Sequence, residues 1–181
     1  MAVVRGVTTW IALFRGINVG GKNVVAMRDL TRVMQSIGAR EIKTYIQSGN
    51  VVFASDTARG VDLEGEIAAT MHTSFGIEAA VQVLSVTDFK AAAARNPFGD
   101  VEGKSLHLYF LEAKPSAPDL DALASLQSES ERYVLDGNVF YLHAPDGIGR
   151  SKLAARAEKL LGVSATARNW NTVSKLLALA G

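Results

Sequence analysis

A short hairpin pattern that occurs twice constrains the fold more than any other feature of the sequence. Residues 45–53 read Tyr-Ile-Gln-Ser-Gly-Asn-Val-Val-Phe, and residues 133–141 read Tyr-Val-Leu-Asp-Gly-Asn-Val-Phe-Tyr. In both copies a Gly-Asn pair separates apolar, β-branched and aromatic runs. Because glycine and asparagine tolerate positive φ, this is the chemistry of a turn between two strands. The repeat indicates that the chain contains two similar halves.

Hydrophobic periodicity extends each hairpin into the same series of elements. The first half is predicted to contain a strand at 10–15, a helix at 27–37, strands at 42–46 and 51–54, a helix at 61–75, a strand at 79–84 and a short helix at 89–94. The second half is predicted to contain a strand at 106–111, a helix at 120–126, strands at 133–135 and 139–143, a helix at 153–161, a strand at 163–167 and a helix at 172–180.

Each half therefore reads βαββαβ followed by a helix, which is the element order of the ferredoxin-like fold. We expect an α+β protein of two ferredoxin-like halves, residues 1–98 and 99–181, related by tandem duplication and packed as one compact unit. The boundary falls at Asn96-Pro97 and the glycines that follow, because this is the most loop-like stretch of the chain.

Composition excludes several classes of function. The chain has no cysteine, which rules out disulfides, thiolate metal sites and cysteine nucleophiles and favours a cytoplasmic location. The first apolar run, residues 10–14, is too short for a signal peptide or a membrane span, so no membrane association is expected. None of the three histidines has a partner at metal-ligand spacing. We expect no metal and no cofactor, and the sequence indicates no catalytic residue.

Charge is unevenly distributed along the chain. Residues 1–43 carry a net charge of +5 and residues 145–181 a net charge of +4, whereas the segment between them carries −8, which leaves +1 overall. If the two basic segments form one face, that face attracts anionic ligands. The structural alternative is that these charges lie on solvated helix faces.

The sharpest motif is the glycine-rich loop at residues 15–23, between a predicted strand and a predicted helix. Its spacing matches a phosphate loop, but Asn23 replaces the hydroxyl that binds magnesium, and the helical pattern starts only near Met27. An anion-binding nest of backbone N–H groups remains a candidate, and a plain glycine-rich connection is the alternative. The candidate ligand-binding residues here are Arg15, Gly16, Asn18, Gly20, Gly21 and Lys22.

Two further turns in the second half combine cations with helix-capping residues. Ser151 or Asp146 can cap the helix predicted at 153–161, and a helix N-terminus favours phosphate. Because the third and fourth strands of a ferredoxin-like sheet end on the same side, the turns at 150–152 and 168–169 are expected at one end of the sheet. The candidate residues there are Arg150, Ser151, Lys152, Arg168 and Asn169.

Three separated stretches, residues 12–23, 44–53 and 166–173, resemble a widespread bacterial family of unknown function. They read ALFRGINVGGKN, TYIQSGNVVF and TARNWNTV, and the resemblance spans nearly the whole chain. It implies an α+β fold with ferredoxin-like halves. It implies no reaction, ligand or catalytic residue.

The leading hypothesis is that the chain binds a phosphate-bearing ligand, a nucleotide or nucleic acid, through its basic glycine-rich loops. One alternative is an enzyme acting on a small anionic substrate between the halves. Another is a non-catalytic interaction protein whose motif residues only cap helices and pack the halves.

Overall fold

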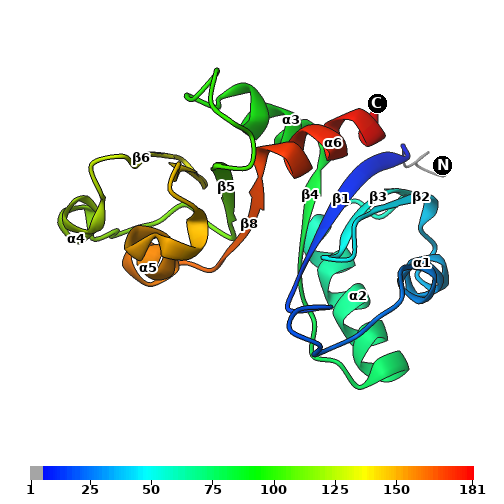
Figure 1. The fold of residues 1–181 in the computed structure, drawn as a ribbon. Coiled ribbons are helices and arrows are strands. Elements are labelled where there is room, and N and C mark those ends of the chain that lie inside the picture. Colours follow the sequence, from blue (N-terminus) through cyan, green and yellow to red (C-terminus); the bar gives the residue numbers. More distant parts are fainter. Residues whose placement is uncertain (1–5) are drawn as a thin grey trace. The chain divides into compact units, whose positions relative to one another are not determined.

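The computed structural model describes residues 6–181, which form two compact units (Figure 1). Unit 1 contains the described residues up to Ala91 together with Leu176–Gly181, and unit 2 is Ala92–Lys175. Each unit contains a four-stranded antiparallel sheet and two helices with the same order of elements, which is consistent with duplication. The placement of a domain boundary between residues 98 and 99 stays a prediction.

The sheet of unit 1 has the strand order β2-β3-β1-β4. Its strands are β1 (Thr8–Arg15), β2 (Arg40–Tyr45), β3 (Asn50–Ser55) and β4 (Ala80–Ser85). Every pairing is antiparallel, with β1 in the centre between β3 and β4. This strand order is that of the ferredoxin-like fold predicted from the sequence.

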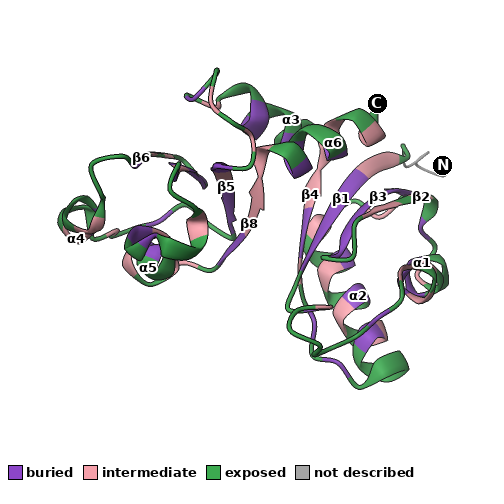
Figure 2. Ribbon diagram, viewed as in Figure 1, coloured by how far each residue is buried: buried purple, intermediate pink, exposed green. Residues whose placement is uncertain are grey.

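Two helices supply the core of unit 1, α1 (Met27–Ser36) and α2 (Gly60–Phe75). Their apolar residues recur at helical spacing and pack against alternate residues of β1 and β3, so both helices cover the same face of the sheet. All of β3 is buried, as the colouring of Figure 2 shows for the central strands. Gly76 ends α2 with a φ of 64°, which is the left-handed conformation that glycine adopts at helix ends.

Unit 2 has the equivalent strand order β6-β7-β5-β8. Its strands are β5 (Leu106–Leu111), β6 (Arg132–Asp136), β7 (Val139–His143) and β8 (Ala165–Asn169). The helices α4 (Leu120–Leu126) and α5 (Lys152–Leu161) cover one face, and the 3-10 turn η1 (Ile148–Arg150) leads into α5. The core beneath these helices includes Tyr109, Phe140 and Leu153.

Each sheet is followed directly by a further helix, α3 (Val86–Ala94) after β4 and α6 (Trp170–Ala180) after β8. The last six residues of the chain belong to unit 1. There the Lys43 ammonium donates to the Leu179 carbonyl at 2.9 Å, and the Lys90 ammonium donates to a Gly181 oxygen at 2.8 Å. Two lysines of unit 1 therefore hold the C-terminus.

The structure corrects two boundaries that the sequence predicted. Ile46 is not the end of a strand but a turn residue with a φ of 47°, a conformation that is rare for a β-branched side chain. The last strand is also shifted by two residues, so Arg168 and Asn169 lie in β8 and Trp170 begins α6 without an intervening loop. In both places tertiary contacts set the backbone more strongly than local propensity.

Candidate functional site

The glycine-rich loop of unit 1 is a small hairpin rather than a phosphate loop. Val19 and Lys22 form an isolated antiparallel bridge, and the Lys22 N–H donates to the Val19 carbonyl at 3.0 Å. Gly20 and Gly21 both have positive φ, which is the geometry of a two-residue type I′ turn. Helix α1 starts five residues beyond Lys22, at Met27. Lys22 therefore lies at the exposed tip of a turn.

Asn18 ties the base of this hairpin to a second loop, the β2–β3 turn at residues 46–49. Its Nδ2 donates to the Gln47 carbonyl at 2.8 Å and to the Val25 carbonyl at 2.9 Å, and its Oδ1 accepts from the Val25 N–H at 2.7 Å. Asn23 Nδ2 adds a bond to the Gly16 carbonyl at 2.9 Å. The carboxamide of Asn18 thus bonds to backbone groups of the protein itself. This gives a structural reason for an asparagine at this position of the stretch 12–23.

Gly49 completes the contact between the two loops. Its φ is 83°, and a Cβ built on it would lie 2.6 Å from Phe14 Cβ and 2.7 Å from Ile17 Cδ1. The Phe14 N–H donates to the Gly49 carbonyl at 2.9 Å. Only glycine fits this close approach between strand β1 and the turn. Two of the stretches that carry the family resemblance therefore interlock at one end of unit 1.

These interlocked loops present an exposed surface. Val19, Val24 and Ile46 are 62%, 71% and 50% exposed, and the side chains of Arg15 and Lys22 are exposed beside them. The predicted residues Gly16, Gly20 and Gly21 are exposed as well. The structure brings the first group of candidate residues onto one loop, but there they form a protruding hairpin rather than a cradle.

In unit 2 the predicted residues at 150–152 lie at the N-terminus of α5. Ser151 is buried, and its Oγ accepts from the Ala154 N–H at 3.0 Å, which makes it the helix cap. The predicted capping role is confirmed for Ser151, and this bond satisfies one of the unpaired amides of the first turn. The amides of Lys152 and Leu153 have no acceptor among the residues that the structure describes.

A cavity of about 400 Å³ opens beside this helix end. Arg150 and Lys152 line it, and neither forms an ion pair with a residue in the described part of the chain. Helix α5 has ten residues, so its N-terminus carries the partial positive charge of a full helix dipole. The residues that line the cavity are Ser125, Leu126, Ser128, Glu131, Asp146, Gly147, Arg150, Ser151 and Lys152.

The cavity lining also contains two carboxylates, Glu131 and Asp146. Glu131 is only 5% exposed, and its Oε2 accepts from the Ser128 N–H at 3.0 Å. Asp146 is exposed, and its Oδ2 accepts from the Ser130 hydroxyl at 2.5 Å. The two carboxylates are held by neighbouring donors rather than by the two cations.

Arg168 and Asn169 do not line this cavity. The ends of β7 and β8 flank the start of β5 as predicted, because His143 pairs with Leu106 and Asn169 pairs with His107. Arg168, however, pairs with Leu108 and so faces the side of the sheet opposite α5, where its Nη1 donates to the Ala167 carbonyl. Asn169 Oδ1 accepts from the Thr172 N–H at 2.9 Å and caps α6, as its sequence context predicts.

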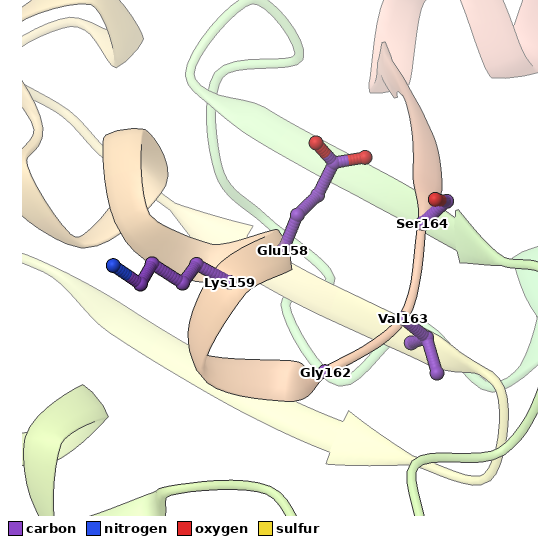
Figure 3. Close-up of a pocket in the computed structure, with 5 residues that line it drawn as sticks. All are labelled: Glu158, Lys159, Gly162, Val163 and Ser164. Carbon is purple, nitrogen blue, oxygen red and sulfur yellow. The ribbon is translucent and has the colours of Figure 1, made fainter.

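A second hollow, of about 330 Å³, lies at the other end of α5 (Figure 3). Glu158, Lys159, Gly162, Val163 and Ser164 line it, and in Figure 3 the Glu158 and Lys159 side chains point in different directions. Glu158 Oε1 accepts from the Ala165 N–H at 2.7 Å. Because the C-terminal end of a helix carries partial negative charge, this hollow is the less favourable of the two for an anion.

The titratable groups of unit 2 are perturbed mainly by burial. Burial lowers the pKa of His107 and of His143, and it raises the pKa of Tyr109 to about 12, with the nearby charges of Glu158 and Glu131 acting in the same direction. The two histidines lie on different faces of the sheet, since Leu106 rather than His107 pairs with His143. No group of three or more His, Cys, Asp or Glu side chains within residues 6–181 is arranged to hold a metal ion.

The fold and these sites define an α+β protein with two ferredoxin-like units and a cavity at the N-terminus of α5 that is lined by two cations and two carboxylates. The chain belongs to the family described as protein of unknown function (DUF1697), whose match covers residues 7–141. That match includes the interlocked loops of unit 1, whereas Arg150 and Lys152 lie beyond it.

The solved structure of conserved bacterial protein SP0830 from Streptococcus pneumoniae is similar to this chain. The two share 22% sequence identity with a TM-score of 0.70, over 97% of this chain and 100% of that chain, which shows a common fold. A search of curated proteins found no match. Within residues 6–181 no helix is long and apolar enough to cross a membrane.

Sequence reasoning missed the acidic side of the cavity. Glu131 and Ser128 lie in the loop before β6, about twenty residues before the cations, and no motif in the sequence singles them out. The register of the β6–β7 hairpin is the signal that locates these two residues. In an antiparallel hairpin the start of the first strand lies beside the end of the second, and Arg132 pairs with His143. The loop before β6 therefore adjoins the loop after β7.

Proposed function

We propose that this protein binds a phosphate-bearing ligand, such as a nucleotide, a nucleic acid end or another phosphate ester, in the cavity beside α5. One observation carries the proposal. Two cations without an ion-pair partner in the described chain, Arg150 and Lys152, line one cavity of about 400 Å³, and the amide of Lys152 has no acceptor among the described residues. This volume lies within the range of small-molecule sites in proteins.

The chemistry of the residues suits a phosphate group. The guanidinium of Arg150 offers paired donors that match phosphate oxygens, and Lys152 adds a compact positive charge. The amide of Lys152 lies in the first turn of α5, at the positive end of the helix dipole, where anions are stabilised. The Ser151 hydroxyl accepts from the Ala154 amide, the third of the helix. The amide of Lys152 is not used by this cap and is left for a ligand.

The glycine-rich loop of unit 1, residues 15–23, is a separate candidate for a phosphate site. Arg15 and Lys22 supply charge there, but Gly20 and Gly21 form an exposed turn. In this loop Asn18 shapes the backbone instead of contacting a ligand. Arg168 is assigned no contact with the α5 cavity, because its side chain belongs to the other face of the sheet. A cytoplasmic location, expected from the absence of cysteine, fits a ligand of this kind.

Isothermal titration calorimetry with inorganic phosphate, AMP and glucose 6-phosphate tests the proposal. The double variant Arg150→Ala with Lys152→Ala is expected to weaken binding of every phosphate compound by at least about 100-fold, since each of the two lost charged contacts is worth about 1.5–3 kcal/mol.

The matched control is Lys114→Ala with Lys159→Ala. It removes the same charge from exposed positions outside the cavity and is expected to bind like the unaltered protein. Equal weakening by both double variants would mean that only net charge matters, and binding that persists in the first variant would reject the cavity as the phosphate site.

A further inference from the structure

The cavity lining combines cationic and acidic residues, and this combination narrows the class of ligand. Arg150 and Lys152 belong to η1 and the start of α5, whereas Glu131, Asp146 and the hydroxyls of Ser125 and Ser128 come from α4 and the loops before β6 and after β7. Formal charges of the lining side chains balance. A ligand that is anionic throughout, such as a polyphosphate, would place negative charge against the two carboxylates, which costs free energy in a partly desolvated site.

Glu131 is the carboxylate that favours a ligand with hydrogen-bond donors. It is 5% exposed and lines the cavity, and its Oε2 is held by the Ser128 N–H. Its Oε1 has no hydrogen-bond partner among residues 6–181. A carboxylate oxygen in this state is an acceptor for a ligand O–H or N–H group, and bonds of this kind are stronger than bonds between neutral groups.

The lining also argues against recognition of a nucleobase. Of the nine described residues that line the cavity, Leu126 is the one large apolar side chain, and none is aromatic. Proteins that bind free bases commonly stack them on aromatic rings or on an arginine plane, and the one arginine of this lining, Arg150, is assigned to the phosphate. Hydroxyl groups, by contrast, need acceptors such as carboxylates and serine oxygens, which this cavity contains.

We infer that the ligand is a sugar phosphate, with its phosphate at the side chains of Arg150 and Lys152 and at the Lys152 amide, and with its hydroxyl groups donating to Glu131 and Asp146. This inference rests on the proposed phosphate site and names its ligand class. The carboxylates favour a ligand that carries hydroxyl groups as well as a phosphate. Inorganic phosphate lacks the sugar hydroxyls, so it contacts only the cationic part of the lining.

Calorimetry of the full chain with ribose 5-phosphate, glucose 6-phosphate, AMP, inorganic phosphate and glucose separates the possibilities. The sugar phosphates are expected to bind about tenfold or more tightly than inorganic phosphate, because at least one charge-assisted hydrogen bond is added. Glucose without phosphate is expected to bind more weakly than either. AMP binding as tightly as the sugar phosphates in the unaltered protein and equally in Glu131→Gln would overturn the assignment to a sugar.

The variant Glu131→Gln is expected to affect the two kinds of probe differently. It is expected to weaken the sugar phosphates about tenfold and to leave inorganic phosphate unchanged or slightly tighter, since it removes a negative charge but keeps the shape. Asp146→Asn, at an exposed position, is a second variant with the same expected direction and little risk to folding.

The outcomes distinguish this inference from the proposal on which it rests. If the double variant at Arg150 and Lys152 abolishes phosphate binding but Glu131→Gln and Asp146→Asn affect all probes alike, the phosphate site stands and the sugar assignment is wrong. If no probe depends on Arg150 and Lys152, the phosphate site itself is wrong.

Discussion

Replacing Asn18 by alanine tests whether the two loops of unit 1 are interlocked as described. The substitution removes three side-chain hydrogen bonds, two to Val25 and one to the Gln47 carbonyl. The matched control is Asn23→Ala, which removes one bond, to the Gly16 carbonyl. Both asparagines have positive φ, 54° and 50°, so the strain of an alanine in the left-handed region is nearly the same in the two variants.

The difference between the variants therefore isolates two hydrogen bonds. At about 0.5–1.5 kcal/mol of net stability for each bond, Asn18→Ala is expected to lower the free energy of unfolding by about 1–3 kcal/mol more than Asn23→Ala. The measurement is urea unfolding followed by the fluorescence of Trp10, which is buried in unit 1, with Trp170→Phe in every protein to silence the signal from unit 2. Equal destabilisation by the two substitutions would refute the interlocked geometry.

Three further predictions concern packing and ionisation. Gly49→Ala is expected to destabilise unit 1 by about 2–4 kcal/mol because of its φ of 83° and a 2.6 Å clash, whereas Gly65→Ala, at an open position within α2, is expected to stabilise it by about 0.5–1 kcal/mol in the same urea assay. The Tyr141 hydroxyl donates to the Ala92 carbonyl at 2.6 Å, so Tyr141→Phe is expected to cost about 1–2 kcal/mol in unit 2 by calorimetric melting. Tyr109 has a pKa raised from 10.0 to about 12, so its contribution to stability is complete below pH 10 and is lost as the pH rises to 12, amounting to about 2–3 kcal/mol. Tyr109→Phe is expected to flatten that part of the pH profile, and an unchanged slope would contradict the shift.

The order of elements could be predicted from the sequence because two independent signals agreed. The repeated Gly-Asn hairpin fixed the number of halves, and helical spacing in segments such as Met27–Ser36 fixed which elements flank each hairpin. Local rules also narrowed the cap of α5 to Ser151 or Asp146 and that of α6 to Asn169 or Asn171, because capping depends on residues only three positions apart, and the structure has Ser151 and Asn169 in these roles.

Contacts between distant segments could not be predicted in the same way. The sequence favours a strand through Ile46, yet Asn18 bonds to the next carbonyl and Gly49 packs against β1, and these contacts fix a turn there. The cations of the α5 cavity, Arg150 and Lys152, could be predicted from the sequence because they lie close together in one turn. Glu131 could be added only once the pairing of β6 with β7 was known.

The most direct test of the central claim is a titration of ¹⁵N-labelled protein with inorganic phosphate, followed by amide chemical shifts. The phosphate site at α5 predicts saturable shifts at the Lys152 and Leu153 amides that disappear in the double variant Arg150→Ala with Lys152→Ala. Shifts confined to the loop at Gly20 and Lys22, or no saturable shift at the start of α5, would contradict it.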